Sequence, residues 1–196
     1  MQKTWVWSTT GFTLVGKSHE EIQRLCRGAG LAGIEASVEL FPTTSEAELE
    51  AIGASYREAG LQFDSFHLPF EADDDIASFY ESTRRQAVDK ARYWMERAAL
   101  LGARVGIQHP TTNRLNADVE GLDNYFRQLD KSLQVLLPAA EQLGFVIALE
   151  NLPPGEAGGR LSARPEHFAR FTAEFAHPNL GFCLDTGHAL IAAGPE

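Results

Sequence analysis

The sequence predicts an α/β fold in which parallel strands alternate with helices and curve into an incomplete (β/α) barrel of about six units. Short apolar runs of strand length recur along the chain, and most of them follow a helical pattern that ends near a glycine. A glycine just past a helix tolerates the left-handed backbone that stops it. Strands that alternate with helices favour a parallel sheet covered by helices, either doubly wound or closed into a barrel.

Six strands are expected, and the absence of a nucleotide-binding turn favours the barrel. The expected strands cover residues 5–7, 33–35, 61–67, 103–109, 145–150 and 180–185. No GxGxxG pattern follows the first strand, and residues 11–14 do not supply a phosphate-cradling turn. The doubly wound alternative therefore loses its commonest support.

Several helix boundaries can be assigned from capping residues. Ser18 with Glu21 and Ser45 with Glu48 have the spacing of a capping box, which predicts helices from about residues 19 and 46. Pro165 is suited to the first turn of a later helix. Longer amphipathic patterns cover residues 76–101 and 119–143.

Composition indicates the class of protein. A chain of 196 residues, 44% of them hydrophobic, is suited to one domain over residues 1–196. No apolar run reaches the roughly 18 residues of a membrane span, and the start lacks a secretory leader pattern, so we expect a cytoplasmic protein. The formal net charge of -10 opposes binding to nucleic acid or to a membrane. The expected partner is a small molecule.

Five of the expected strands end near a side chain that can bind a metal or transfer a proton. These residues are Glu35, His67, His109, Glu150 and Asp185. In a parallel barrel the carboxyl ends of the strands surround one mouth, so residues distant in sequence meet there. We therefore expect these side chains to converge on one site.

Strand alternation predicts that the carboxylates point into the barrel. Side chains two residues apart share a face of a strand. Gly181 and Cys183 share the face of Asp185, whereas the bulky Phe182 and Leu184 point the other way. The small residues leave room for a ligand, and the bulky ones are suited to packing against helices.

Each candidate also has a structural interpretation. Glu35 could be a solvated loop acid, and His67 and His109 could be core histidines bonded to carbonyl groups. Glu150 follows an apolar pentapeptide, where an ionised carboxylate is costly unless a cation or hydrogen-bond donors compensate it. Asp185 could cap the following helix and still bind a metal. Arg160, in a glycine-rich loop, is expected at the surface, with a substrate anion as the alternative partner.

Two segments resemble the xylose-isomerase-like superfamily, which includes sugar isomerases, sugar epimerases and zinc-dependent abasic-site endonucleases. They are Ile-Ala-Leu-Glu-Asn at 147–151 and Cys-Leu-Asp-Thr-Gly-His at 183–188. The resemblance implies a TIM-type barrel in which Glu150 binds a metal and acts as the acid–base carboxylate, and Asp185 binds the metal. It implies that His188 contacts substrate, and we also count His188 as a candidate metal ligand. His67 and His109 occupy strand ends that carry zinc ligands in the endonuclease branch and carry groups that contact substrate or support the metal ligands elsewhere.

The function that this resemblance implies is a metal-dependent sugar or sugar phosphate isomerase or epimerase. Glu150 would remove a proton next to a carbonyl, giving an enediolate. Glu35, the only other inward carboxylate, is a candidate for binding substrate. The oxygen ligands favour Mn or Mg, with Zn or Co as alternatives because of the histidines. Two other interpretations stay open: a non-catalytic degenerate barrel that binds a ligand, and an endonuclease-like metal-dependent phosphodiesterase.

The resemblance departs from the family pattern after residue 188. Family members continue with two further βα units, which supply a metal-binding histidine and a second catalytic glutamate, whereas this sequence ends at Glu196. Six units cannot close an eight-stranded barrel and leave two strand edges unpaired. We expect either a homo-oligomer that covers these edges or a truncated gene product, and the departure puts enzymatic activity in doubt.

Overall fold

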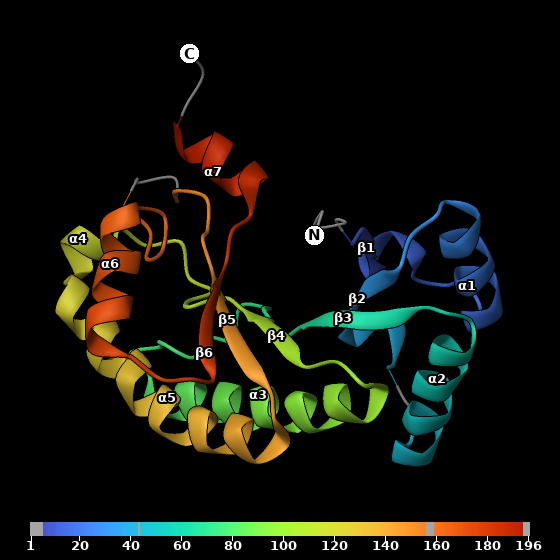
Figure 1. The fold of residues 1–196 in the computed structure, drawn as a ribbon. Helices are drawn as coiled ribbons and strands as arrows, with labels where there is room; N and C mark the ends of the chain where they lie inside the picture. The colour runs from blue at the N-terminus through green and yellow to red at the C-terminus, as the bar shows by residue number, and fades with distance from the viewer. Residues whose placement is uncertain (1–5, 43, 156–158, 194–196) are drawn as a thin grey trace.

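The computed structural model describes residues 6–42, 44–155 and 159–193 and confirms the α/β class. Six parallel strands form one sheet in the order β1-β2-β3-β4-β5-β6, so neighbours in sequence are neighbours in space (Figure 1). The strands are β1 (Ser8–Thr10), β2 (Gly33–Ser37), β3 (Gln62–His67), β4 (Val105–Gln108), β5 (Val146–Glu150) and β6 (Leu180–Cys183).

Helices cover the outer face of the curved sheet, as expected for an incomplete barrel (Figure 1). They are α1 (His19–Gly28), α2 (Glu46–Glu58), α3 (Glu81–Leu101), α4 (Ala117–Glu120), α5 (Leu122–Leu143) and α6 (Pro165–Glu174). The last helix, α7 (Thr186–Ala193), projects beyond the end of β6 and has no buried residue. Two short 3-10 helices, η1 (Gly11–Leu14) and η2 (Val38–Leu40), follow the first two strands.

Capping residues account for the starts of α1 and α2. The capping box of α2 is complete, because the Ser45 hydroxyl accepts from the Glu48 amide and the Glu48 carboxylate accepts from the Ser45 amide. Ser18 caps α1 in the same way, but Glu21 binds Lys17 at 3.0 Å instead of returning to the cap. Both helices begin at the predicted positions.

The longer helices differ from the amphipathic patterns at one end. The first pattern starts at residue 76 but α3 starts at Glu81, because Asp75 turns back to accept a hydrogen bond from the Ala77 amide. The second pattern divides into α4 and α5 at Gly121, whose φ of 93° is incompatible with a continuous helix. Pro165 occupies the first turn of α6 as predicted.

The predicted first strand was misplaced. The structure puts β1 at Ser8–Thr10, after the aromatic run at 5–7, of which residue 5 lies outside the described residues. Pairing explains the shift, because β2 begins at Gly33, which lies opposite Ser8. Of the two described residues before Ser8, only Trp7 bonds to the segment before β2, through its carbonyl to the Ala32 amide. Trp7 itself is 68% exposed.

The core lies between the outer face of the sheet and the helices. Phe66 of β3 stacks on Trp94 of α3 at 5.6 Å between ring centroids, and Phe126 of α5 stacks on Phe171 of α6 at 5.0 Å. Burial of these rings provides the main driving force for attaching the helix layer to the sheet. The inner face of the sheet is left to bear polar groups.

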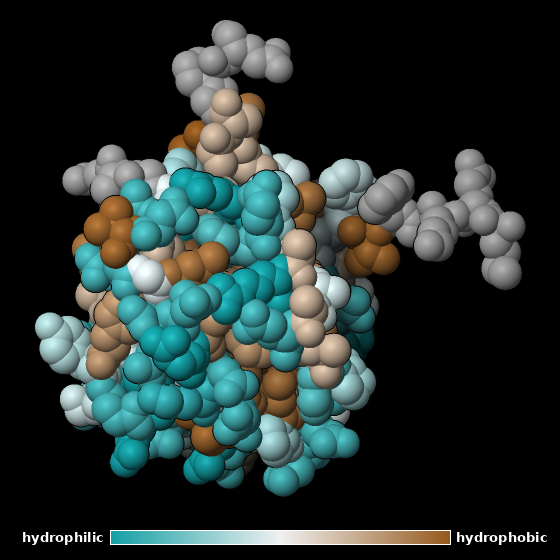
Figure 2. Space-filling view, turned by 90° about the vertical axis from the view of Figure 1, so that its left-hand side faces the viewer, coloured by the Kyte–Doolittle hydropathy of each residue, from teal (hydrophilic) through white to brown (hydrophobic). Residues whose placement is uncertain are grey.

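Two strand edges of the described sheet are unpaired. β1 pairs only with β2 and β6 only with β5, and apolar side chains are exposed near β6, including Phe182 and Leu184. By contrast, the face that carries α4 to α6 is mostly hydrophilic (Figure 2). None of the described helices has the length and apolarity to cross a bilayer.

Candidate active site

Histidine and acidic side chains meet at the carboxyl end of the sheet. His67 ends β3, Glu150 ends β5, and His109 directly follows β4. Asp185 lies two residues beyond β6, and His188 lies in the first turn of α7. The loops that follow parallel strands open on one side of the sheet, which brings these five residues together.

Glu150 is the centre of this group. Its side chain is nearly buried, with 6% of the residue exposed. Oε2 lies 3.0 Å from Nε2 of His109 and 3.8 Å from Nε2 of His67, whereas Oε1 lies 3.8 Å from Nδ1 of His188. His109 lies at hydrogen-bond distance from Oε2 and His67 lies beyond it, and Oε2 makes no hydrogen bond of good geometry to a described residue.

A β-bulge in β3 brings His67 into the site. Ile34 of β2 pairs with Phe63 and Glu35 pairs with Ser65, so no residue of β2 pairs with Asp64. An extra residue in a strand reverses the alternation beyond it. Consequently Phe63 and Phe66, three positions apart, both point toward the helices, where they contact Tyr56 and Trp94. His67 then points inward.

Hydrogen bonds to main-chain carbonyls orient two of the histidines. His67 Nδ1 lies 2.9 Å from the Leu68 carbonyl, and His188 Nδ1 lies 2.8 Å from the Asn151 carbonyl. Because a carbonyl only accepts, Nδ1 carries the proton in each ring and Nε2 is left as a lone-pair donor. For His67 the free Nε2 is the atom that faces Glu150, an arrangement typical of histidines that bind metals. His188 instead faces Glu150 and Asp185 with Nδ1, the atom that the Asn151 carbonyl engages.

Asn151 holds the second half of the site, a role that was not predicted from the sequence. Its side chain accepts from the Asp185 amide at 2.6 Å and donates to the Asp185 carbonyl at 2.8 Å. Asp185 Oδ1 in turn accepts from the His188 amide at 2.7 Å, so it caps α7 as the sequence suggested. The Glu-Asn pair therefore links the ends of β5 and β6.

A family model of the xylose isomerase-like TIM barrel matches residues 23–196. The chain belongs to this family. No curated protein sequence matches the chain. The solved structures that it resembles include a D-tagatose 3-epimerase-like protein, with 22% identity and a TM-score of 0.77, which matches over 94% of this chain and 66% of its own.

Two further structures have the same fold. A 3-keto-D-glucoside 4-epimerase from E. coli has 18% identity and a TM-score of 0.76, over 94% of this chain and 70% of its own. A D-psicose 3-epimerase, solved in the presence of D-fructose, has 15% identity and a TM-score of 0.76, over 92% of this chain and 63% of its own. The 196-residue chain thus spans about two thirds of the length of these three proteins.

The side-chain ligand atoms around Glu150 fit a divalent cation. Ligand atoms of His67, His109 and Glu150 lie within 4.8 Å of one another, and so do those of Glu150, Asp185 and His188. The two groups share Glu150. A buried carboxylate oxygen without a hydrogen-bond donor is costly, and a cation would compensate it. Mixed imidazole and carboxylate ligands are suited to Mn, Zn or Co as well as Mg.

The charges of the site are strongly coupled. Burial alone would raise the pKa of Glu150, but His109 and His67 beside it lower that pKa to about 2. The pKa values of the two histidines shift in opposite directions. Burial lowers the pKa of His109, whereas for His67 the contacts with Glu150 and the Leu68 carbonyl outweigh burial and raise the pKa. Glu150 is therefore ionised over the physiological range.

Glu35 lies at the edge of the site and belongs to neither ligand group. It is half-buried on β2, and Oε2 accepts a hydrogen bond from Ser65 at 3.1 Å. Burial raises the pKa of Glu35, and its charge interacts with those of His67, Glu150 and Asp185. Its inward orientation agrees with the prediction from alternation.

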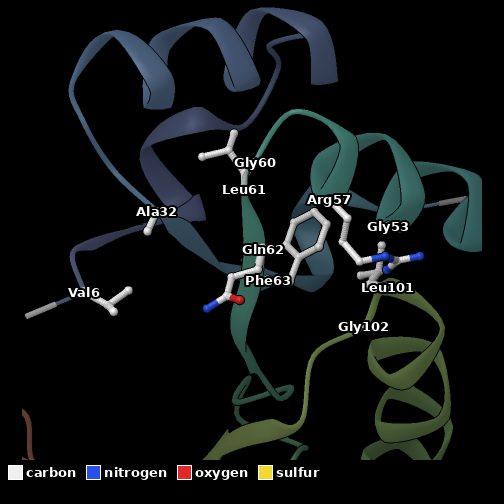
Figure 3. Close-up of a pocket in the computed structure, with 10 residues that line it drawn as sticks. All are labelled: Val6, Ala32, Gly53, Arg57, Gly60, Leu61, Gln62, Phe63, Leu101 and Gly102. Atoms are coloured by element: carbon white, nitrogen blue, oxygen red, sulfur yellow. The ribbon is translucent and has the colours of Figure 1, made fainter. Parts of the chain in front are cut away.

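A hollow of about 430 Å³ lies at the opposite end of the sheet (Figure 3). It is lined by the start of β3 and the ends of α2 and α3, and Arg57 is the charged residue among its lining side chains. Without acid–base groups this hollow offers no chemistry comparable to that around Glu150.

Proposed function

We propose that this chain is a metal-dependent sugar or sugar phosphate isomerase or epimerase that transfers a proton on a carbon next to a carbonyl. The observation that carries the proposal is the buried Glu150 carboxylate, which two groups of potential metal ligands share. The similar structures described as tagatose-type and psicose 3-epimerases support the same class of reaction.

Glu150, Asp185 and His188 are the residues proposed to hold the metal. Their carboxylate oxygens favour Mn or Mg, and the nearby imidazoles of His67 and His109 would favour Zn or Co if they also bound. A bound divalent metal would supply Lewis acidity to a substrate carbonyl. We assign His67, His109 and His188 to binding substrate hydroxyl groups at the same mouth.

Glu150 is also the proposed base, and its electrostatics limit how it can act. A carboxylate with a pKa of about 2 is ready to accept a proton but is a weak base. The C–H proton must therefore be acidified by the polarised carbonyl before Glu150 takes it, giving an enediolate. Glu35, whose pKa is raised, is better suited to hold a proton for the other side of the substrate.

One observation favours a second candidate function, metal-dependent phosphodiester cleavage. The group of His67, His109 and Glu150 adds two imidazoles to the carboxylates, a ligand set that favours zinc. The net charge of -10 opposes binding to a polyanion. A third alternative, a binding protein without catalysis, would retain the mouth but bind no metal.

Solvent exchange tests the proposed reaction directly. The protein would be incubated with ketoses and ketose phosphates in D₂O with Mn²⁺ or Mg²⁺, and loss of the proton next to the carbonyl would be followed by NMR. We expect exchange by the parent and a loss of about 10² to 10⁴-fold in Glu150→Gln, since the amide cannot accept the proton. Glu141→Gln, a change at an exposed position on α5, should exchange like the parent.

Circular dichroism would show that both variants are folded. An E150Q protein that exchanges at the parent rate would show that another residue is the base. A parent protein that exchanges no proton with any of these substrates would contradict the proposed function.

A further inference from the structure

Arg160 is a buried cation in the loop that joins β5 to α6. Only 7% of the residue is exposed, whereas the sequence suggested a surface arginine. Its hydrogen bonds to described residues all end on main-chain carbonyls: Nε donates to Asn113 at 2.8 Å, and Nη2 donates to Thr111 at 3.2 Å and Thr112 at 3.3 Å. A buried charge needs such compensation to be tolerated.

The three carbonyls belong to the loop that directly follows His109. This loop has left the sheet, so its carbonyls have no ladder partners, and a guanidinium with several donors in a fixed fork can bind them together. The loop that follows Glu150 is thus attached to the loop that follows His109.

A buried acid binds the same segment. Asp75, 4% exposed, lies in the loop after β3. It accepts from Thr111 Oγ1 at 3.1 Å and from Asn113 Nδ2 at 3.3 Å. Tyr125 of α5 adds a hydrogen bond to Asn113 Oδ1 at 3.1 Å. The loops after β3, β4 and β5 are therefore connected through residues 111–113.

We propose that Arg160 is a positioning residue that fixes the His109 loop to the Glu150 loop and so holds the His109 imidazole beside the Glu150 carboxylate. The inference rests on the proposed metal centre. Its geometric basis is that the three connected loops follow the strands that present His67, His109 and Glu150. His109 and Glu150 lie at the ends of the neighbouring strands β4 and β5, so the 3.0 Å between their side chains depends on the positions of the two loops relative to each other.

The test compares Arg160 with another buried arginine. Arg97 of α3 is 8% exposed and lies over the rings of Tyr93 and Trp94, away from the site. Arg160→Met and Arg97→Met each remove one buried guanidinium. Co²⁺ alone would be titrated into each protein and followed by visible absorption, with hydrogen exchange of residues 109–116 and urea unfolding as independent measurements.

We expect R160M to bind Co²⁺ about 10 to 100-fold more weakly, because His109 would no longer be held 3.0 Å from Glu150, a proposed ligand, and losses of this size are typical when the support of a metal ligand is removed. Residues 109–116 should also exchange faster. R97M should lose stability but retain the parent's affinity and loop protection. Arg160→Lys should be intermediate, because an ammonium can bind one or two carbonyls but not as a fork. R160K also provides the comparison if R160M does not fold.

Equal Co²⁺ affinity in R160M and R97M would overturn the proposal, and so would faster loop exchange without a change in affinity. A parent that binds no Co²⁺ would overturn it together with the metal centre. A parent that binds Co²⁺ but exchanges no substrate proton would contradict the proposed reaction alone, since the comparison of the arginine variants depends only on binding.

Discussion

Replacing Glu150 with glutamine should destabilise the protein in a way that depends on pH. In the folded chain the pKa of Glu150 is about 2, against an ordinary value of 4.5. A carboxyl whose pKa is depressed on folding stabilises the fold above its unfolded pKa, and this contribution is lost as the pH falls through the folded value. The ionised carboxylate therefore contributes fully above about pH 5 and little below pH 2.

The pKa difference sets the size of the effect. Ionised Glu150 adds about 3 kcal/mol to the free energy of unfolding when its contribution is complete. About 2 kcal/mol of this appears as the pH rises from 3 to 5.5. His67 sets the upper end of the pH range in which the difference is largest. Because its pKa is raised on folding, protonated His67 stabilises the fold fully below pH 6.5, and this stabilisation is lost as the pH rises through the pKa of the folded state. The advantage of the parent over E150Q should therefore be greatest between about pH 5 and 6.5.

Urea unfolding in the presence of EDTA measures this difference, with Trp94 fluorescence as the signal. The free energy of unfolding would be compared for the parent, E150Q and the exposed control E141Q at pH 3 and pH 5.5. E141Q should follow the parent at both pH values. If the parent exceeds E150Q by the same amount at both, the histidines do not lower the pKa of Glu150, and the electrostatic description of the site is wrong.

Three further outcomes are expected. Gly53→Ala should cost about 1 to 3 kcal/mol in urea unfolding, because a Cβ there would lie 2.4 Å from the Leu101 carbonyl oxygen; a neutral result would mean that α2 can move away from α3. Mn²⁺ or Zn²⁺ should raise the Tm of the parent and raise that of Asp185→Asn much less, whereas equal shifts would exclude Asp185 as a ligand. Light scattering should give a mass above the monomer that falls in Leu184→Lys, because the exposed apolar edge at β6 needs a cover; a stable parent monomer would contradict this.

Much of the fold could be predicted because it depends on local signals. The strand–helix alternation, the caps at Ser18 and Ser45 and the proline at 165 are short-range features, and each appears in the structure where the sequence placed it. The first strand was misplaced because its position depends on where β2 begins, which a run of aromatic residues does not reveal.

The site was predicted in part for the same reason. The clustering of Glu150, Asp185 and the histidines follows from parallel topology, which collects the ends of strands at one mouth. The β-bulge was missed, although two phenylalanines three positions apart, at 63 and 66, with polar residues between them are a signal of broken alternation.

Long-range hydrogen bonds explain the other omissions. Asn151 was noted as part of a motif, but its bonds to Asp185 join residues 34 positions apart. The burial of Arg160 depends on a loop 47 residues earlier in the chain, whose free carbonyls only the folded structure brings to it. Local sequence carries no record of such partners.

The position of a bound metal tests the central claim most directly. Crystals grown with Mn²⁺ would be examined for anomalous scattering, and the metal content of the protein in solution would be measured. We predict one ion per chain, with Glu150 and Asp185 among its ligands. Several zinc ions per chain would favour the phosphodiesterase alternative, and a protein that binds no ion beside Glu150 would contradict the claim that this buried carboxylate is the centre of a metal site.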